Sequence, residues 1–166
     1  MKWNIPFIGN RGPEAPPEPF GNGVAPVRGT ISLTKILVVD DDQVILKTIR
    51  HKLERVGYRV ATALDGTEAI AAIRVEKPDL ILLDITFPPD VFGVPWDGFR
   101  IMEWLHHLDG PKKIPVIIIT GGQEVKNKER ALAAGAVAFF NKPINHDDLL
   151  KVIQETLTSV PSSWPG

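Results

Sequence analysis

Hydrophobic and polar positions alternate in blocks from Lys35 onward. Four short runs of branched, aromatic or small apolar residues are bounded by polar residues, at 36–39, 80–83, 116–119 and 137–140. Continuous runs of this kind are typical of strands that a parallel sheet buries on both faces. A fifth segment, residues 58–62, mixes polar and apolar residues and is predicted to form an edge strand.

Stretches with helical spacing follow these strands, because their apolar residues recur every three or four positions. These residues are Ile45, Ile49, Leu53 and Val56; then Ala69, Ile70 and Ile73; then Ile101, Met102, Leu105 and Leu108; and finally Leu149, Ile153 and Leu157. Residues 124–134 form a further expected helix, ended by Gly135, and Asp65 and Asn145 are expected N-caps. Strict alternation of strand and helix predicts an α/β fold, a doubly wound five-stranded parallel sheet with helices on both faces.

The first 34 residues have a different composition from the rest. Proline and glycine recur throughout them, which excludes a helix or a central strand. Two interpretations stay open: a flexible or loosely docked extension, or a partner-binding peptide, since Trp3, Phe7 and Phe20 are more apolar than a linker needs. We therefore expect an extension at 1–34, one domain at 35–158, and a tail at 159–166 that is too short for an effector domain.

Composition narrows the possible functions. The 166 residues carry 19 Lys plus Arg against 20 Asp plus Glu, a net charge of −1 that gives no support for nucleic-acid binding. The chain has no cysteine, which excludes disulfides and thiolate zinc sites and makes the cytoplasm the simplest expected location. No apolar run approaches the roughly 20 residues that span a bilayer, so no membrane insertion is expected.

Chemically capable side chains follow four of the predicted strands. Because the carboxyl ends of parallel strands share one edge of the sheet, these side chains are expected to meet there. They are Asp40, Asp41 and Asp42 after the first strand, Asp84 after the third, Thr120 after the fourth and Lys142 after the fifth.

Such a set suits phosphoryl chemistry. Clustered carboxylates repel one another unless a cation offsets them, and Mg²⁺ prefers oxygen ligands. A carboxylate can attack phosphorus to form an acyl phosphate, whose negative oxygens Lys142 and Thr120 would then hold. Taken alone, each residue has a simpler interpretation: the Asp cluster as a helix N-cap, and the others as turn or surface residues. Only the combination favours a site.

Four motifs together resemble the response-regulator receiver domain. They are Lys-Ile-Leu-Val-Val-Asp-Asp-Asp at 35–42, Leu-Ile-Leu-Leu-Asp at 80–84, Ile-Ile-Ile-Thr-Gly at 117–121 and Phe-Phe-Asn-Lys-Pro at 139–143. The resemblance covers residues 35–158 and implies the flavodoxin-like strand order 2-1-3-4-5. It also implies Mg²⁺-dependent transfer of a phosphoryl group from a phosphohistidine on a histidine kinase or a histidine phosphotransfer protein. The phosphorylated chain would then switch its contacts with a downstream protein that the sequence does not identify.

The resemblance also assigns roles to single residues. Asp84 would be the phosphoacceptor, and Asp40 and Asp41 would bind Mg²⁺ with Asp84 and the backbone carbonyl of Thr86. Thr120 and Lys142 would hold the phosphoryl oxygens, with a cis bond between Lys142 and Pro143. Phe139 stands where the family has an aromatic residue that shifts together with Thr120, but phenylalanine has no hydroxyl for a hydrogen-bonded version of that switch. The chain would catalyse only its own phosphorylation and dephosphorylation.

One segment departs from the family pattern. Residues 88–96, between Asp84 and the Asp97-Gly98 pair, contain an insertion that makes this stretch about six residues longer than the family pattern. A longer loop costs little entropy, so it can be a tolerated lengthening. Alternatively its three prolines, with Phe92 and Trp96, form a lip over the phosphorylation site or a surface that selects partners.

Two other functions remain open at this point. Asp40-Asp41-Asp42-Gln43-Val44 also fits the nucleophile motif of haloacid-dehalogenase-like phosphatases, in which Asp40 would be the nucleophile and hydrolysis would be true turnover. That family needs a further acidic pair after a later strand, whereas this chain is expected to end in a helix there. A pseudo-receiver that only binds partners is the other alternative, although every acceptor residue is present.

Overall fold

A computed structural model describes residues 34–86, 97–107, 113–121 and 125–159. The predictions made for the extension, the insertion, the tail and Leu108 fall almost wholly on other residues and lie outside the described parts. Among the described helices, none is long and apolar enough to cross a membrane.

Five parallel strands form one sheet in the order β2-β1-β3-β4-β5. Their bounds are Lys35–Val39 for β1, Arg59–Ala63 for β2, Leu80–Leu83 for β3, Val116–Thr120 for β4 and Ala138–Asn141 for β5. The predicted sheet and its order are therefore confirmed. So is the edge position of the mixed strand β2, which starts one residue later than the pattern indicated.

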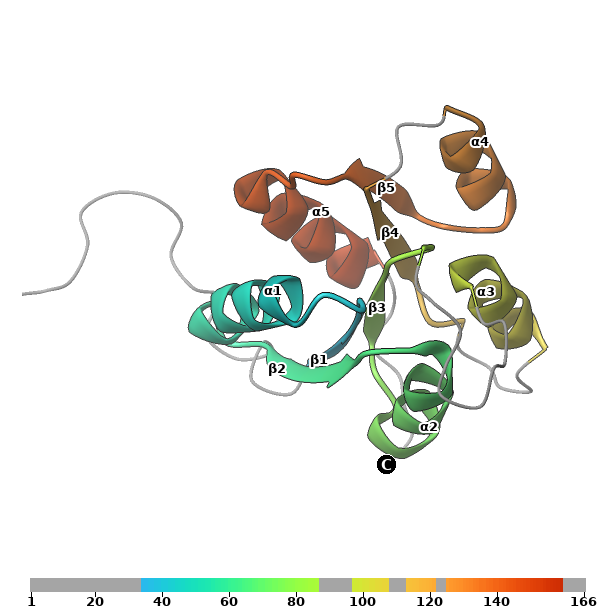
Figure 1. The fold of residues 1–166 in the computed structure, drawn as a ribbon. Helices are drawn as coiled ribbons and strands as arrows, with labels where there is room; N and C mark the ends of the chain where they lie inside the picture. The colour runs from blue at the N-terminus through green and yellow to red at the C-terminus, as the bar shows by residue number, and fades with distance from the viewer. Residues whose placement is uncertain (1–33, 87–96, 108–112, 122–124, 160–166) are drawn as a thin grey trace, which may run out of the picture.

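The described residues form five helices that cover both faces of the sheet; four of them connect successive strands and the fifth follows β5. They are α1 at Gln43–Arg55, α2 at Gly66–Glu76, α3 at Gly98–His106, α4 at Val125–Ala133 and α5 at His146–Ser159. Figure 1 shows α1 and α5 on one face of the sheet and α2, α3 and α4 on the other. This is the doubly wound arrangement that the alternating pattern predicts.

The sheet separates two apolar cores because successive strand side chains point to opposite faces. On β1, Ile36 and Val38 belong to the core beneath α1 and α5, whereas Leu37 and Val39 belong to the core beneath α2, α3 and α4. With both faces covered by helices, the buried polar side chains that these strands carry lie at or just beyond the strand ends.

The helices start where the sequence places capping residues. Asp65 accepts a hydrogen bond from the Glu68 backbone N–H at 2.8 Å, and the Glu68 carboxylate accepts one from the Leu64 N–H at 2.8 Å. Asn145 accepts from the Asp147 N–H at 3.0 Å. Both predicted caps are confirmed, and each satisfies N–H groups that the first turn of a helix leaves without a partner.

The inner face of α1 differs slightly from the expected one. Ile49 and Leu53 are buried as the spacing indicates, and Leu46 joins them, while Ile45 is only partly buried. Val56 is 38% exposed, because it is the C-cap residue and its backbone has already left the helical conformation. A periodic pattern cannot show where a helix stops to within one turn.

Candidate functional site

Four strand ends bring polar side chains together at the carboxyl edge of the sheet. Asp40 follows β1, Asp84 follows β3, Thr120 ends β4 and Lys142 follows β5. Asp40, Asp84 and Thr120 are only 2%, 4% and 0% exposed, and they are the buried polar side chains of the described part of the chain. Since burial of polar groups is costly unless they are paired, their partners define the site.

Lys142 joins the two buried carboxylates. Its ammonium Nζ lies 2.6 Å from Asp40 Oδ2 and 2.6 Å from Asp84 Oδ2. The Lys142 backbone N–H donates to the Thr120 carbonyl at 2.8 Å, and the Lys142–Pro143 bond is cis, as the resemblance implied. One cation thus bridges acids from two different strands.

Asp84 is fixed through both of its carboxylate oxygens. Oδ1 accepts a hydrogen bond from the Thr86 backbone N–H at 2.8 Å, and Oδ2 accepts from Lys142 at 2.6 Å. The Thr86 hydroxyl oxygen lies 3.5 Å from that of Thr120, and the Thr120 side chain is fully buried. The orientation of the Asp84 carboxylate is therefore set by the backbone of Thr86 on one side and by Lys142 after β5 on the other.

Burial and charge act in opposite directions on the two ionisable partners of Asp84. Burial raises the pKa of Asp40, which outweighs the hydrogen bonds from Lys142 and the Asp42 N–H, and the negative charge of Asp84 raises it further. For Lys142, burial lowers the pKa, but hydrogen bonds to Asp40 and Asp84 more than offset this and leave it raised. Lys142 is consequently a permanent cation at neutral pH.

The acidic residues also form a group suited to a metal ion. Asp40, Asp41 and Asp84 each offer a carboxylate oxygen, and these oxygens lie within 4.8 Å of one another. Asp41 is exposed while the other two are buried, so the group opens to solvent on one side. An all-oxygen set of this kind fits Mg²⁺. Asp42 has another use, because its Oδ1 caps α1 by accepting from the Val44 N–H at 2.7 Å.

Gly98 is a residue of the site that the sequence analysis did not single out. A Cβ at this position would lie 2.7 Å from the Asp84 carbonyl oxygen and 2.7 Å from the Ile85 Cα. The first residue of α3 therefore packs directly on the backbone that carries Asp84. Its only signal in the sequence was the Asp97-Gly98 pair, which marked the end of the insertion and gave no hint of this close approach.

Phe139 lies on β5, paired in register with Ile118. It packs, partly buried, against the core beneath α2, α3 and α4. Its assigned part in a switch with Thr120 stays a prediction.

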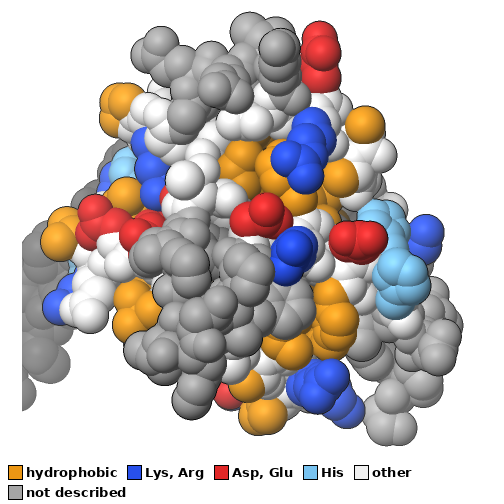
Figure 2. All heavy atoms as spheres, turned by 45° about the vertical axis from the view of Figure 1, so that its right-hand side comes forward, with side chains coloured by type: hydrophobic (Ala, Val, Ile, Leu, Met, Phe, Trp, Pro, Cys, Tyr) orange, Lys and Arg blue, Asp and Glu red, His pale blue; other side chains and the backbone are white. Residues whose placement is uncertain are grey.

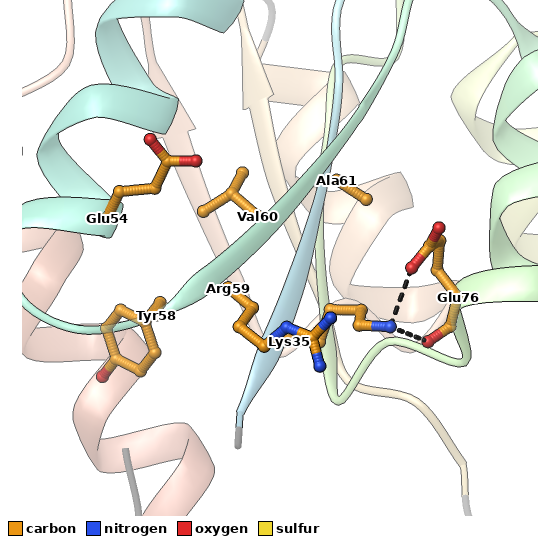
Figure 3. A pocket seen from close by; sticks show the side chains of 7 residues that line it. All are labelled: Lys35, Glu54, Tyr58, Arg59, Val60, Ala61 and Glu76. Atoms are coloured by element: carbon orange, nitrogen blue, oxygen red, sulfur yellow. Dashed lines mark hydrogen bonds and ion pairs between the residues drawn. The ribbon is translucent and has the colours of Figure 1, made fainter. Parts of the chain in front are cut away.

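A separate cavity of about 360 Å³ lies at the opposite, amino-terminal end of the sheet. It is lined by Lys35, Glu54, Tyr58, Arg59, Val60, Ala61 and Glu76 (Figure 3). Lys35 crosses this region to the Glu76 carboxylate at 2.7 Å and to the Glu76 carbonyl at 2.9 Å. None of the residues that line the cavity belongs to the Asp84 site.

Several known proteins are similar to this chain over nearly all of the described region. Protein PilH of Pseudomonas aeruginosa is 33% identical over 125 residues, which are 75% of this chain and 98% of PilH. The polar-differentiation response regulator DivK of Brucella anthropi is 30% identical over 74% of this chain and 94% of DivK. The alkaline phosphatase synthesis transcriptional regulatory protein PhoP of Bacillus subtilis is 37% identical over 67% of this chain, but the chain spans only 43% of PhoP.

Solved structures show the same fold. A CheY-like response regulator receiver domain protein from Methanospirillum hungatei has a TM-score of 0.67 and 37% identity, over 77% of this chain and 96% of that one. Chemotaxis protein CheY4 of Vibrio cholerae has a TM-score of 0.65 and 31% identity, over 74% and 97% of the two chains. Residues 36–154 match the family described as the response regulator receiver domain, well over half of the 166 residues. The chain belongs to the receiver-domain family of two-component response regulators.

Proposed function

We propose that this chain accepts a phosphoryl group on Asp84, in a Mg²⁺-dependent transfer from a phosphohistidine donor. Receiver domains are signalling modules that histidine kinases or phosphotransfer proteins phosphorylate on aspartate, and this chain belongs to that family. The observation that carries the proposal is the buried Lys142 bridge, which holds a cation 2.6 Å from the Asp84 carboxylate. The receiver unit would span residues 35–158.

The chemistry requires little of the protein beyond position and charge. An oxygen of Asp84 attacks the phosphorus of the donor, the P–N bond to the donor imidazole breaks, and an acyl phosphate forms on Asp84. The leaving imidazole keeps the electron pair of that bond and takes a proton from water. The Lys142 ammonium neutralises the negative phosphoryl oxygens, and the Thr120 hydroxyl donates a hydrogen bond to one of them.

The charge balance of the site supports the need for a divalent cation. Asp40, Asp41 and Asp84 carry three carboxylates against the single ammonium of Lys142, before any phosphoryl group arrives. The three carboxylates and the Thr86 carbonyl would hold Mg²⁺, which when bound supplies positive charge next to the incoming phosphoryl oxygens.

The output would be a change of protein contacts. Phosphorylation that draws Thr120 toward the phosphoryl group would favour one of two arrangements of the neighbouring β5 region, including Phe139. The downstream partner would read this shift in population. The extension at 1–34 and the insertion at 88–96 are proposed sites of partner choice.

Incubation with Mg²⁺ and acetyl phosphate, followed by intact mass measurement, tests the proposal. The wild-type chain is expected to gain one phosphate, and Asp84→Asn is expected to gain none. Asp41→Asn should slow the gain at limiting Mg²⁺, and removing Mg²⁺ with a chelator should abolish it. Glu76→Gln is the control, because it neutralises an acid at the other end of the sheet and should react like the wild type.

A separate turnover assay with a phosphomonoester tests the phosphatase alternative. Continuous hydrolysis of a phosphomonoester that Asp40→Asn abolishes and Asp84→Asn leaves unchanged would overturn the receiver proposal. Membership of the receiver-domain family supports the receiver proposal over this alternative.

A further inference from the structure

Helix α3 contacts the phosphoacceptor segment at one end and α4 at the other. Its amino end is Gly98, whose N–H donates to the Ile85 carbonyl at 3.3 Å. As described above, the Gly98 Cα approaches the Asp84–Ile85 backbone so closely that a Cβ would overlap it. A displacement of the Asp84–Ile85 backbone therefore acts directly on Gly98, because no side chain lies between them that could adjust its conformation instead.

The next residue of α3 contacts α4. Phe99 packs against the apolar core, and the Arg130 guanidinium carbon of α4 lies 3.8 Å from the centre of its ring. This is well within the distance of about 6 Å at which a cation is attracted to an aromatic face. Figure 2, in which the side of the molecule carrying α3 and α4 is turned forward, shows basic side chains lying among hydrophobic ones on this surface.

The carboxyl end of α3 contacts the end of α4 as well. His106 Nε2–H donates to the Ala134 carbonyl at 2.8 Å, just beyond the last residue of α4. The same ring leaves only 3.2 Å to a Cβ built on Gly135, which has a φ of +91° and turns the chain out of the helix. Two contacts, one near each end of α3, thus tie α4 to it.

We propose that α3 couples the Asp84 backbone to the position of α4 through Gly98, Phe99 and His106, so that phosphorylation changes α4 by way of α3. This coupling rests on the proposed phosphorylation of Asp84. It is separate from the switch assigned to Thr120 and Phe139, because it runs through the contact of Gly98 with Asp84 and Ile85 and not through β4 and β5. Phe99, His106 and Arg130 are positioning residues and do not touch the reacting atoms.

Amide hydrogen exchange in α4, measured with and without Mg²⁺ and acetyl phosphate, tests the coupling. In the wild type, phosphorylation is expected to change exchange within Val125–Ala133. Phe99→Leu keeps an apolar side chain on the core but removes the ring, and it should reduce this change at least twofold while intact mass still shows one phosphate. The exposed Arg130→Gln is a milder second variant with the same expected effect.

The chain offers a matched control on the same helix. Arg74 of α2 lies over Trp104 of α3 at 5.4 Å, so Arg74→Gln removes a similar contact that does not involve α4. It should leave the response of α4 intact. A full response in both Phe99→Leu and Arg130→Gln, or an equal loss in Arg74→Gln, overturns the coupling.

Failure of phosphorylation itself gives a different result. If no variant gains phosphate, the proposed function is wrong, and the contact between α3 and α4 is judged in the unmodified chain. There Arg130→Gln should accelerate α4 exchange roughly two- to fivefold, as loss of an exposed cation–π contact implies, and Arg74→Gln should not. Equal exchange rates in the two variants contradict the inference.

Discussion

Two lysines at opposite ends of the sheet make ion pairs of nearly equal length in very different surroundings. Lys142 lies 2.6 Å from its acidic partners and Lys35 lies 2.7 Å from Glu76, and the two lysine side chains are 18% and 19% exposed. The acidic side chains differ: counting side-chain atoms alone, those of Asp40 and Asp84 are 3% and 4% exposed, whereas that of Glu76 is 39% exposed. Ion-pair distance alone thus says little about what a pair contributes.

The two pairs differ in how well water would solvate the carboxylate if the lysine were absent. Water can solvate the Glu76 carboxylate, so its pairing with Lys35 replaces hydration with an ion pair of similar free energy. Asp40 and Asp84 have no such alternative, and they repel each other. The Lys35–Glu76 pair therefore links the start of β1 to the end of α2 at the surface. Lys142, in contrast, offsets the repulsion between two buried carboxylates.

Removing each lysine should separate the two cases most clearly. Lys142→Met leaves two buried carboxylates without their shared cation, and it is expected to lower the free energy of unfolding by about 3 kcal/mol. Lys35→Met should lower it by much less in the same urea unfolding experiment at neutral pH without Mg²⁺, because water can solvate Glu76. Similar losses for the two variants would mean that burial of the acids does not distinguish the pairs.

Glycine substitutions sharpen the comparison within the carboxyl edge itself. Gly98→Ala forces a Cβ to within 2.7 Å of backbone atoms of Asp84 and Ile85, and should cost about 2 kcal/mol of unfolding free energy. Gly121→Ala is the control, because nothing lies within 4 Å of a Cβ there, and it should be close to neutral. A neutral Gly98→Ala would show that the backbone of Asp84 and Ile85 moves easily away from α3, which also weakens the coupling proposed for α3.

Neutralising one acid at each end of the sheet should change the free energy of unfolding by small amounts of opposite sign. Burial raises the pKa of Asp40, so ionised Asp40 opposes folding at neutral pH, and Asp40→Asn should be the more stable chain there. Lys35 lowers the pKa of Glu76, so ionised Glu76 favours folding, and Glu76→Gln should be slightly less stable.

The pH dependence of these two variants checks the signs. The gain in Asp40→Asn should vanish as the pH falls below 3.8, where Asp40 is protonated in both states. The loss in Glu76→Gln should vanish as the pH falls from 4.5 through the lowered pKa of the folded chain. Urea midpoints measured across this range give both curves, and the same sign for both variants would refute the contrast.

The sequence predicted the sheet well because buried parallel strands have a distinctive appearance. Apolar runs such as Leu80–Leu83 have no other simple interpretation, and acids that follow them necessarily meet at one edge. The convergence of Asp40, Asp84, Thr120 and Lys142 could be predicted for this reason.

Other parts of the site could not be predicted, because they depend on side-chain placement. Nothing in the residue spacing indicates that Lys142 bridges two acids and not one. Nor does it indicate that Asp42 is the N-cap of α1 while Asp41 is exposed. The approach of Gly98 to Asp84 and the stacking of Arg130 on Phe99 follow from how α3 is packed, which periodicity leaves undetermined.

The position of Lys142 in the sequence determines when, during synthesis of the chain, the two acids gain their cation. Lys142 follows the last strand, 58 residues after Asp84, so a growing polypeptide completes β1, β3 and β4 before the cation exists. Any sheet built from β1, β3 and β4 alone would hold Asp40 and Asp84 at its edge with no lysine between them. Only the completion of β5 adds the Lys142 ammonium to this acidic edge, so a chain interrupted after β4 would keep the two acids but lack their shared cation.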